Sequence, residues 1–193
     1  MNMAQDMAGL TDEEIVKRVQ SGDAERFGIL VERYEPRLHR YAKKILLDGD
    51  EADDAVQEAL IKAYTNIQSF DAARKFSSWV YRITHNECMN EIKRKKGKVT
   101  IALPDFDVLL PHLVADETST DEVDRKQVRR ELDGLLEKLD PKYREPLVLY
   151  YFEELDYQEI ADVLQIPVST VGVRLRRGRE ALGRVMQKDS VII

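Results

Sequence analysis

Apolar residues recur at three- and four-residue intervals along most of the chain, which is the spacing of one buried face of an α-helix. Thr11 and Glu14 have the spacing of a capping box at the start of a first helix. A second helix is predicted to follow, and Pro36 within it is expected to kink or split it. Two further helices are predicted, one over about residues 51–67 and one from about residue 77 into a basic cluster.

The helical periodicity stops after residue 97 and resumes near residue 124. The intervening segment carries prolines and a run of acidic residues, which is typical of a linker. The pattern therefore predicts an all-α protein made of two small helical domains. They are expected at residues 1–97 and 125–193, with an acidic linker over residues 98–124.

Residues 155–187 have the pattern of a helix-turn-helix. A short helix is predicted over residues 157–164, a turn over residues 165–167 and a long helix over residues 169–187. Ala161 is small at the position where the two helices must cross closely. The second helix of such a motif lies in the major groove of DNA, so the C-terminal domain is predicted to bind DNA.

The long C-terminal helix has an apolar and a polar side at 100° per residue. The side expected to face the core carries Val171, Leu175, Gly178 and Leu182. Opposite it, Arg176 and Arg177 are placed to pair with guanine edges and Val173 to meet a thymine methyl. Arg174 and Arg179 flank this face and suit phosphates. The predicted DNA contacts of the C-terminal domain are Ser169, Thr170, Val173, Arg174, Arg176, Arg177 and Arg179. The alternative is an arginine-rich helix that only faces solvent.

The net charge of −6 argues by itself against a nucleic-acid partner, but the charges are segregated. Residues 74–98 carry eight Lys or Arg and two acids, residues 105–124 carry seven acids and no Lys or Arg, and residues 168–187 carry five Arg and one Glu. Electrostatic fields act within a Debye length of about 10 Å, so the local blocks decide which partner is attracted. Two basic blocks separated by an acidic stretch indicate a polyanionic binding partner.

The fourth predicted helix combines aromatic and basic residues. Aromatic rings beside a cationic surface can stack on unpaired bases while the cations hold the phosphate backbone. The residues concerned are Phe70, Phe76, Trp79, Tyr81, Arg82, His85, Lys93, Arg94, Lys95 and Lys96. The alternative is that the aromatics belong to the core and that the lysines form a basic tail leading into the linker.

The third predicted helix begins with a concentration of polar residues. Acidic residues at a helix start interact favourably with the helix dipole, which is one explanation. Six polar groups within nine residues are more than a cap requires, which favours an acidic face for docking another protein. These residues are Asp50, Glu51, Asp53, Asp54, Gln57 and Glu58.

The sequence argues against an enzyme. His85 and Cys88 are three residues apart on a helix, but a second pair of zinc ligands is missing. The chain has neither a Walker loop, nor a dinucleotide-binding glycine motif, nor a nucleophile elbow. Cys88 is expected to be a small buried residue. We therefore expect no metal, no cofactor and no small-molecule substrate.

The single cysteine precludes a disulfide within the chain and fits a reducing compartment. The first residues lack the basic and apolar regions of a signal peptide. No apolar run approaches the roughly 18 residues that a membrane span needs. We therefore expect a cytoplasmic protein without direct membrane insertion.

Taken in order, three segments resemble the extracytoplasmic-function (ECF) group of sigma-70-type factors, which carry only sigma domains two and four. The matching segments are residues 50–64, residues 76–83 and residues 139–179. Each motif is of moderate specificity, whereas their order and spacing together are specific. The resemblance spans about residues 10–187.

The resemblance implies an alternative sigma factor that binds core RNA polymerase and directs promoter-specific initiation of transcription. It implies that the polymerase clamp helices contact Asp53, Asp54, Gln57 and Glu58. It implies that the minus-ten element is melted and read by the segment containing Phe76, Trp79, Arg82, His85, Asn86 and Lys93. The helix-turn-helix would read the minus-thirty-five element and contact the polymerase flap. Such factors are commonly held inactive by an anti-sigma factor, often membrane-bound, which would tether this chain to the membrane indirectly.

A dimeric helix-turn-helix regulator that is not a polymerase subunit is the alternative. It would explain residues 126–187 and would leave the acidic helix and the Trp79 segment with a purely structural role. Such a regulator should dimerise and bind a palindrome alone. A sigma factor should instead bind core polymerase and show little specific duplex binding by itself.

Overall fold

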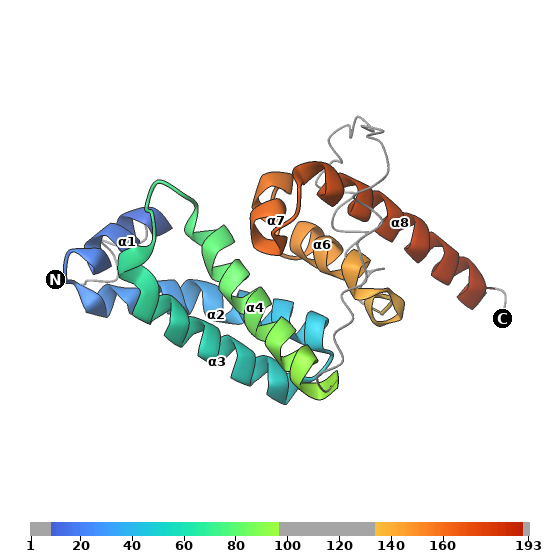
Figure 1. The fold of residues 1–193 in the computed structure, drawn as a ribbon, viewed down its shortest axis with the longest axis horizontal. Helices are drawn as coiled ribbons and strands as arrows, with labels where there is room; N and C mark the ends of the chain where they lie inside the picture. The colour runs from blue at the N-terminus through green and yellow to red at the C-terminus, as the bar shows by residue number, and fades with distance from the viewer. Residues whose placement is uncertain (1–8, 97–133, 191–193) are drawn as a thin grey trace.

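The computed structural model describes residues 9–96 and 134–190, and every regular element within these two ranges is a helix (Figure 1). The first range contains α1 (Asp12–Gln20), η1 (Ala24–Arg26), α2 (Phe27–Leu46), α3 (Gly49–Asn66), η2 (Ile67–Ser69) and α4 (Phe76–Lys96). The second range contains η4 (Leu136–Lys138), α6 (Pro141–Tyr151), α7 (Tyr157–Leu164) and α8 (Val168–Ser190). The all-α fold is confirmed, and the predicted linker over residues 98–124 lies outside the described residues.

Local sequence explains where several helices begin and end. Thr11 Oγ1 accepts from the Glu14 N–H at 3.2 Å and Glu14 Oε2 accepts from the Thr11 N–H at 2.8 Å, so the predicted capping box is confirmed. The same motif begins α7, where Asp156 and Glu159 form the two reciprocal hydrogen bonds at 2.8 and 3.0 Å. Gln165 ends α7 in the left-handed conformation, with φ of 54°, and turns the chain toward α8.

Helix α2 continues through Pro36 as one helix, so the expectation that the proline might split it was wrong. Proline removes one backbone donor, and the carbonyl that loses this donor belongs to Glu32, one turn earlier. Both residues are exposed, so water can bind that carbonyl. On the opposite side, Leu30, Tyr34 and Leu38 are buried and hold the helix in the bundle.

In the first domain, α3 packs against both α2 and α4 (Figure 1). Alanine side chains are small, so they let neighbouring helices approach closely while larger side chains from those helices fill the core. The buried side of α3 carries Ala52, Ala55, Ala59 and Ala63. The opposite side of α3 is thereby turned outward along its whole length.

In the second domain, α8 packs against α6 and α7. Val171 and Leu175 are fully buried and Leu182 nearly so, which confirms the predicted apolar side. Gly178 lies at the closest approach of α8 to α6: a Cβ atom there would be 2.8 Å from Leu147 Cδ1. The missing side chain therefore sets the distance between the two helices.

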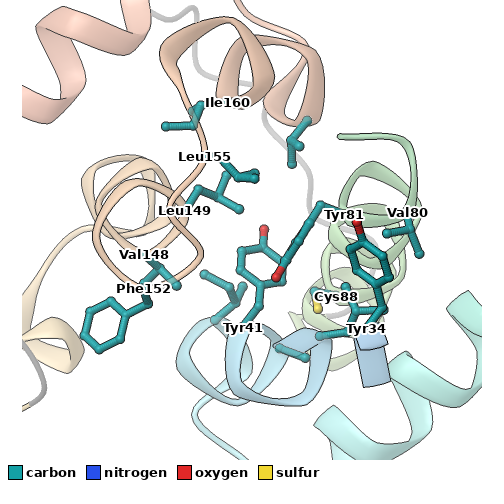
Figure 2. Close-up of a cluster of buried hydrophobic side chains, with 14 of the residues drawn as sticks. Tyr34, Tyr41, Val80, Tyr81, Cys88, Val148, Leu149, Phe152, Leu155 and Ile160 are labelled. Atoms are coloured by element: carbon teal, nitrogen blue, oxygen red, sulfur yellow. The ribbon is translucent and has the colours of Figure 1, made fainter. Parts of the chain in front are cut away.

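The two domains lie against each other, with α7 beside α4 and α6 beside α2 (Figure 1). Figure 2 shows Tyr41 and Tyr81 of the first domain beside Leu149 and Leu155 of the second. All four are buried in one continuous cluster of apolar side chains. The sequence pattern, which indicated two domains joined by a linker, did not predict that the domains pack against each other.

Across the described residues, none of the helices combines the length with the apolar character that a membrane crossing requires.

We expect Gly178→Ala to destabilise the protein, because the new methyl group must displace the buried side chain of Leu147. Gly183→Ala is the matched control, since a Cβ atom there meets nothing within 4 Å and alanine favours a helix. The free energy of unfolding should be lower for Gly178→Ala than for the control by about 1–3 kcal/mol. Urea denaturation measures this difference, and equal stabilities would mean that α6 and α8 do not pack this closely.

Candidate nucleic-acid interface

The side of α8 that faces away from the core carries most of the residues predicted to contact bases. Ser169 and Arg176 are exposed, and Val173 and Arg177 are partly exposed. Arg176 Nη1 lies 2.8 Å from Glu180 Oε1 one turn later. Both groups are about half exposed, so this pair is weak and the guanidinium remains available to a stronger partner.

Three other polar residues of α8 lie closer to the core than the sequence indicated. Thr170 and Arg174 are only 5% and 8% exposed, so the prediction that they contact DNA is corrected for this arrangement. Burial raises the pKa of the Glu145 carboxyl on α6 to about 7, and the charge of Arg174 opposes this increase. Arg179 is partly exposed and its Nη1 lies 3.5 Å from the Tyr151 hydroxyl. Helical phase gives the direction of a side chain, but it does not reveal that α6 covers this flank.

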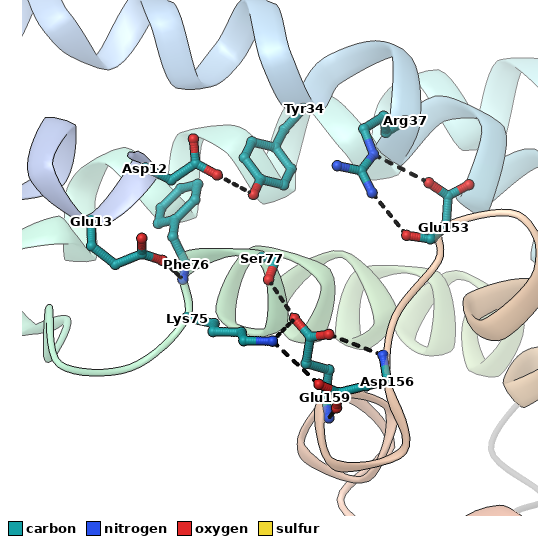
Figure 3. A network of polar contacts seen from close by, with 10 residues as sticks. All are labelled: Asp12, Glu13, Tyr34, Arg37, Lys75, Phe76, Ser77, Glu153, Asp156 and Glu159. Carbon is teal, nitrogen blue, oxygen red and sulfur yellow. Dashed lines mark hydrogen bonds and ion pairs between the residues drawn. The ribbon is translucent and has the colours of Figure 1, made fainter. Parts of the chain in front are cut away.

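Two aromatic residues considered for base stacking belong to the core instead. Phe76 is 1% exposed and meets Tyr34 and Phe70 edge to face, with ring centroids 5.3 and 5.8 Å apart. The Phe76 N–H donates to Glu13 Oε1 at 2.9 Å, which fixes the first residue of α4 against α1 (Figure 3). Tyr81 is also fully buried. The prediction of Phe76 as a base-contacting residue is therefore corrected, because its place at the start of α4 turns the ring inward.

Trp79 and Arg82 lie on a different side of α4 and are partly exposed. Trp79 packs on Phe70, with ring centroids 4.9 Å apart, which leaves part of the indole at the surface. Both residues line a cleft between α4 and α7, which we call the α4–α7 cleft. Its α4 side also carries Lys75 at the turn into the helix, so the wall is aromatic and basic.

The other α4 residues that were predicted to contact DNA lie in two different environments. Asn86 and Lys93 are exposed. His85 Nδ1 lies 3.1 Å from the hydroxyl of Tyr41 on α2 and 4.0 Å from Oε2 of Glu145 in the second domain. Burial lowers the pKa of His85 to about 4, with a smaller effect of Lys93 in the same direction. His85 is therefore neutral at pH 7, and the prediction that it contacts DNA is corrected for this arrangement.

The outward side of α3 carries all four predicted polymerase-contacting residues in exposed positions: Asp53, Asp54, Gln57 and Glu58. The same side continues into Ile61 and Tyr64, which are 53% and 46% exposed. Large apolar side chains at this exposure, next to a group of acids, form a surface suited to another protein. Sequence periodicity missed these two residues because apolar residues are normally assigned to the core.

Cys88 is fully buried, and burial raises the pKa of its thiol to about 12. The prediction that Cys88 is a small buried residue is confirmed. Within residues 9–96 and 134–190, no three His, Cys, Asp or Glu side chains gather closely enough to hold a metal ion.

Two family models match the chain: Sigma-70 region 2 over residues 30–98, and Sigma-70, region 4 over residues 129–182. The chain is 37% identical to the ECF RNA polymerase sigma factor SigW of Bacillus subtilis (strain 168), over 89% of this chain and 95% of that protein. It is 31% identical to the ECF RNA polymerase sigma-E factor of Escherichia coli (strain K12), over 92% and 95% of the two chains.

Two solved structures share the fold. CnrH, in complex with the cytosolic domain of CnrY, has a TM-score of 0.68 and 25% identity, over 92% of this chain and 98% of that chain. The sigma factor RpoE from Bartonella quintana, in complex with the anti-sigma factor NepR, has a TM-score of 0.60 and 25% identity. That match covers 83% of this chain and 96% of RpoE.

We expect Glu145→Gln to change how stability depends on pH. The pKa of Glu145 rises from 4.5 to about 7 on folding, so the folded state binds the proton more tightly. Its contribution to stability is complete below about pH 4.5 and is lost as pH rises to about 7. Glutamine cannot ionise, so the stability of the variant relative to wild type should increase over this range and then level off.

Urea denaturation at pH 5, 6, 7 and 8 measures this difference. His85, whose lowered pKa acts in the opposite direction, is present in both proteins, so to first order its effect cancels. Glu137→Gln, an exposed position near the start of the same domain, is the control and should show no such trend. A difference that does not vary with pH would contradict the burial of an ionisable Glu145.

Proposed function

The chain belongs to the ECF group of the sigma-70 family of bacterial RNA polymerase sigma factors, and we propose that it directs promoter-specific transcription initiation as an alternative sigma factor. The observation that carries this proposal is that both described domains match sigma regions, region 2 over residues 30–98 and region 4 over residues 129–182. A helix-turn-helix repressor does not require a region 2 domain. The dimeric regulator is therefore not favoured.

Core polymerase binds the outward side of α3. Support comes from four exposed polar residues followed by exposed Ile61 and Tyr64 on the same side. The acids attract a basic partner surface, and the two apolar side chains lose contact with water on docking. The polymerase clamp helices are the partner that the family relationship assigns to this surface.

Promoter DNA binds two surfaces. Trp79, Arg82, Asn86 and Lys93 of α4 serve the minus-ten element, since an indole next to cations suits an unpaired base and its phosphate. The exposed side of α8, with Arg176 and Arg177, serves the minus-thirty-five element in the duplex. Phe76 packs against Trp79 on the core side, with ring centroids 5.7 Å apart, and does not contact DNA itself.

An anti-sigma factor controls the chain. Support comes from RpoE, a structural relative over most of its length that is described in complex with the anti-sigma factor NepR. The chain acts in the cytoplasm, and a membrane-bound anti-sigma factor would tether it to the membrane indirectly.

Transcription in vitro with core RNA polymerase tests this function. The purified chain should bind core polymerase and start transcripts from a subset of a promoter-fragment library. Asp54→Ala with Gln57→Ala should weaken core binding by about 1–2 kcal/mol, or roughly 5- to 30-fold, because it removes the centre of the acidic surface. Glu32→Ala with Glu35→Ala, two exposed acids on α2, is the matched control.

A chain that neither binds core polymerase nor initiates transcription would contradict the proposed function. A chain that dimerises and binds a palindromic duplex alone would instead support the regulator. If the α3 pair and the α2 control bind core equally well, the acids on α3 only stabilise the helix.

Arg176→Ala should weaken use of the upstream promoter element by about 1–3 kcal/mol if its guanidinium pairs with a base. Arg184→Ala is the control, since it removes the same charge from an exposed position two turns further along α8. Transcription from promoters with randomised upstream elements measures the sequence preference. Unchanged preference for Arg176→Ala, or an equal change for the control, would refute the assignment of this face.

A further inference from the structure

The last residue of α1 is hydrogen-bonded to the loop that leads from α3 into α4. Gln20 Nε2 donates to the backbone carbonyl oxygens of Ile67 and Phe70, both at 2.8 Å. An amide nitrogen carries two hydrogens, so one side chain can satisfy both carbonyls. The two acceptors are 47 and 50 residues away along the chain, at the first residue of η2 and directly after its last. Gln20 therefore attaches α1 to both ends of this short turn.

The far end of the same loop is held by the first turn of α1. The Phe76 N–H, at the start of α4, donates to Glu13 Oε1 at 2.9 Å (Figure 3). Between the two attachments, the Asp71 carbonyl accepts from the Arg74 N–H at 2.9 Å, which closes a turn. Residues 67–75, which we call the 67–75 loop, thus contain a defined turn between two attachments to α1.

Gln20 is connected to the minus-ten surface of α4 through Phe70. The Phe70 ring is 6% exposed and packs on Trp79, with ring centroids 4.9 Å apart, which is closer than the 5.7 Å between Phe76 and Trp79. Because the carbonyl that Gln20 binds and this ring belong to one residue, holding the carbonyl limits where the ring can lie. Gln20 therefore restricts the position of Trp79, although the two residues lie on different helices.

The 67–75 loop also places polar groups beside the same surface. Ser69, Asp71 and Arg74 line the α4–α7 cleft together with Trp79 and Arg82. Asp71 and Arg74 are exposed, and carboxylate and guanidinium groups can each hydrogen-bond to the edge of a base. Such groups discriminate between bases only when they are held in fixed places. The attachments to α1 provide that constraint.

The exposure of Gln20 separates a positioning role from a role in stability. The side chain is partly exposed, so water can replace its amide at the two carbonyls when it is removed. The cost to folding is then smaller than for a buried donor whose partners are left unsatisfied. Water does not fix the two carbonyls relative to α1, however. The loss of Gln20 therefore affects the geometry of the loop more than the fold.

We propose that Gln20 is a positioning residue for recognition of the minus-ten element: it holds the 67–75 loop and, through Phe70, the Trp79 indole in the places from which they contact promoter DNA. This inference rests on the proposed function, which assigns Trp79 and Arg82 to that element. Helix α1 thereby takes part in promoter selection without contacting DNA. Binding of core polymerase does not depend on Gln20, because the polymerase docks on the outward side of α3.

Gln20→Met in the full chain tests this role, with Gln68→Met as the matched control. Methionine is as long and unbranched as glutamine but lacks its donors. Gln68 is exposed on η2 and is not among the residues that line the cleft. Holoenzymes made with each variant transcribe from promoters randomised in the minus-ten element. Discrimination between preferred and other bases should fall about three- to tenfold for Gln20→Met, with wild-type affinity for core polymerase, and should not change for the control.

Tryptophan fluorescence gives a second readout that does not depend on transcription. Trp79 is the only tryptophan of the chain, so the signal reports on this residue alone. Looser packing of Phe70 should make the indole more accessible to acrylamide, so quenching should increase for Gln20→Met and stay at the wild-type value for Gln68→Met. Gln20→Asn, whose amide is one methylene group shorter, replaces Gln20→Met if that variant has lost helix by circular dichroism.

Wild-type base discrimination in the folded Gln20 variant would overturn this inference, and so would an equal loss in Gln68→Met. Transcription reduced by the same factor on every promoter would also overturn it, since a purely structural role predicts that result. Changed discrimination with unchanged quenching would overturn the connection through Phe70. In each of these cases the wild-type chain still initiates, so the proposed function stands. A wild-type chain that initiates on no promoter contradicts the sigma-factor assignment and this inference with it.

Discussion

The buried carboxylate of Glu153 has to be neutralised, and the groups that do so lie on the other domain. Arg40 supplies a bidentate pair and Arg37 binds the backbone carbonyl of the same residue. This requirement fixes the segment between α6 and α7 against α2 and α4, and hence the position of α7 over the cleft (Figure 3). The apolar contacts around Tyr41, Tyr81 and Leu149 add buried apolar area between the two domains. The ion pair, because its geometry is defined, also fixes how the two domains are aligned.

Within each domain, small residues decide which surfaces are left for partners. The alanines of α3 let it lie close to α2 and α4, which turns its acidic and apolar side outward. Gly178 does the same for α8 against α6, so that Ser169 and Arg176 face outward. Close packing on one side of a helix is therefore the physical reason that the other side is available for polymerase or DNA.

Much of the fold and part of the candidate site were predictable from local pattern. The capping box at Thr11, the bounds of α7 and the buried side of α8 follow from residue type and periodicity, and all three are confirmed. The site was predicted less well, because a residue's type says little about what covers it. Phe76 and His85 have the chemistry of nucleic-acid contacts, but one lies in the core and the other faces Glu145.

By itself, the sequence determined the helices, the helix-turn-helix, the segregation of charge and the resemblance to a two-domain sigma factor. These properties depend on spacing along the chain and on local hydrogen bonds, both of which can be recognised from the amino-acid sequence. Only the tertiary structure decided that Arg174 is turned inward, that Ile61 is exposed and that Glu153 meets Arg37 and Arg40. Those outcomes depend on contacts between residues as many as 116 positions apart, and a single sequence carries no local signal for such contacts.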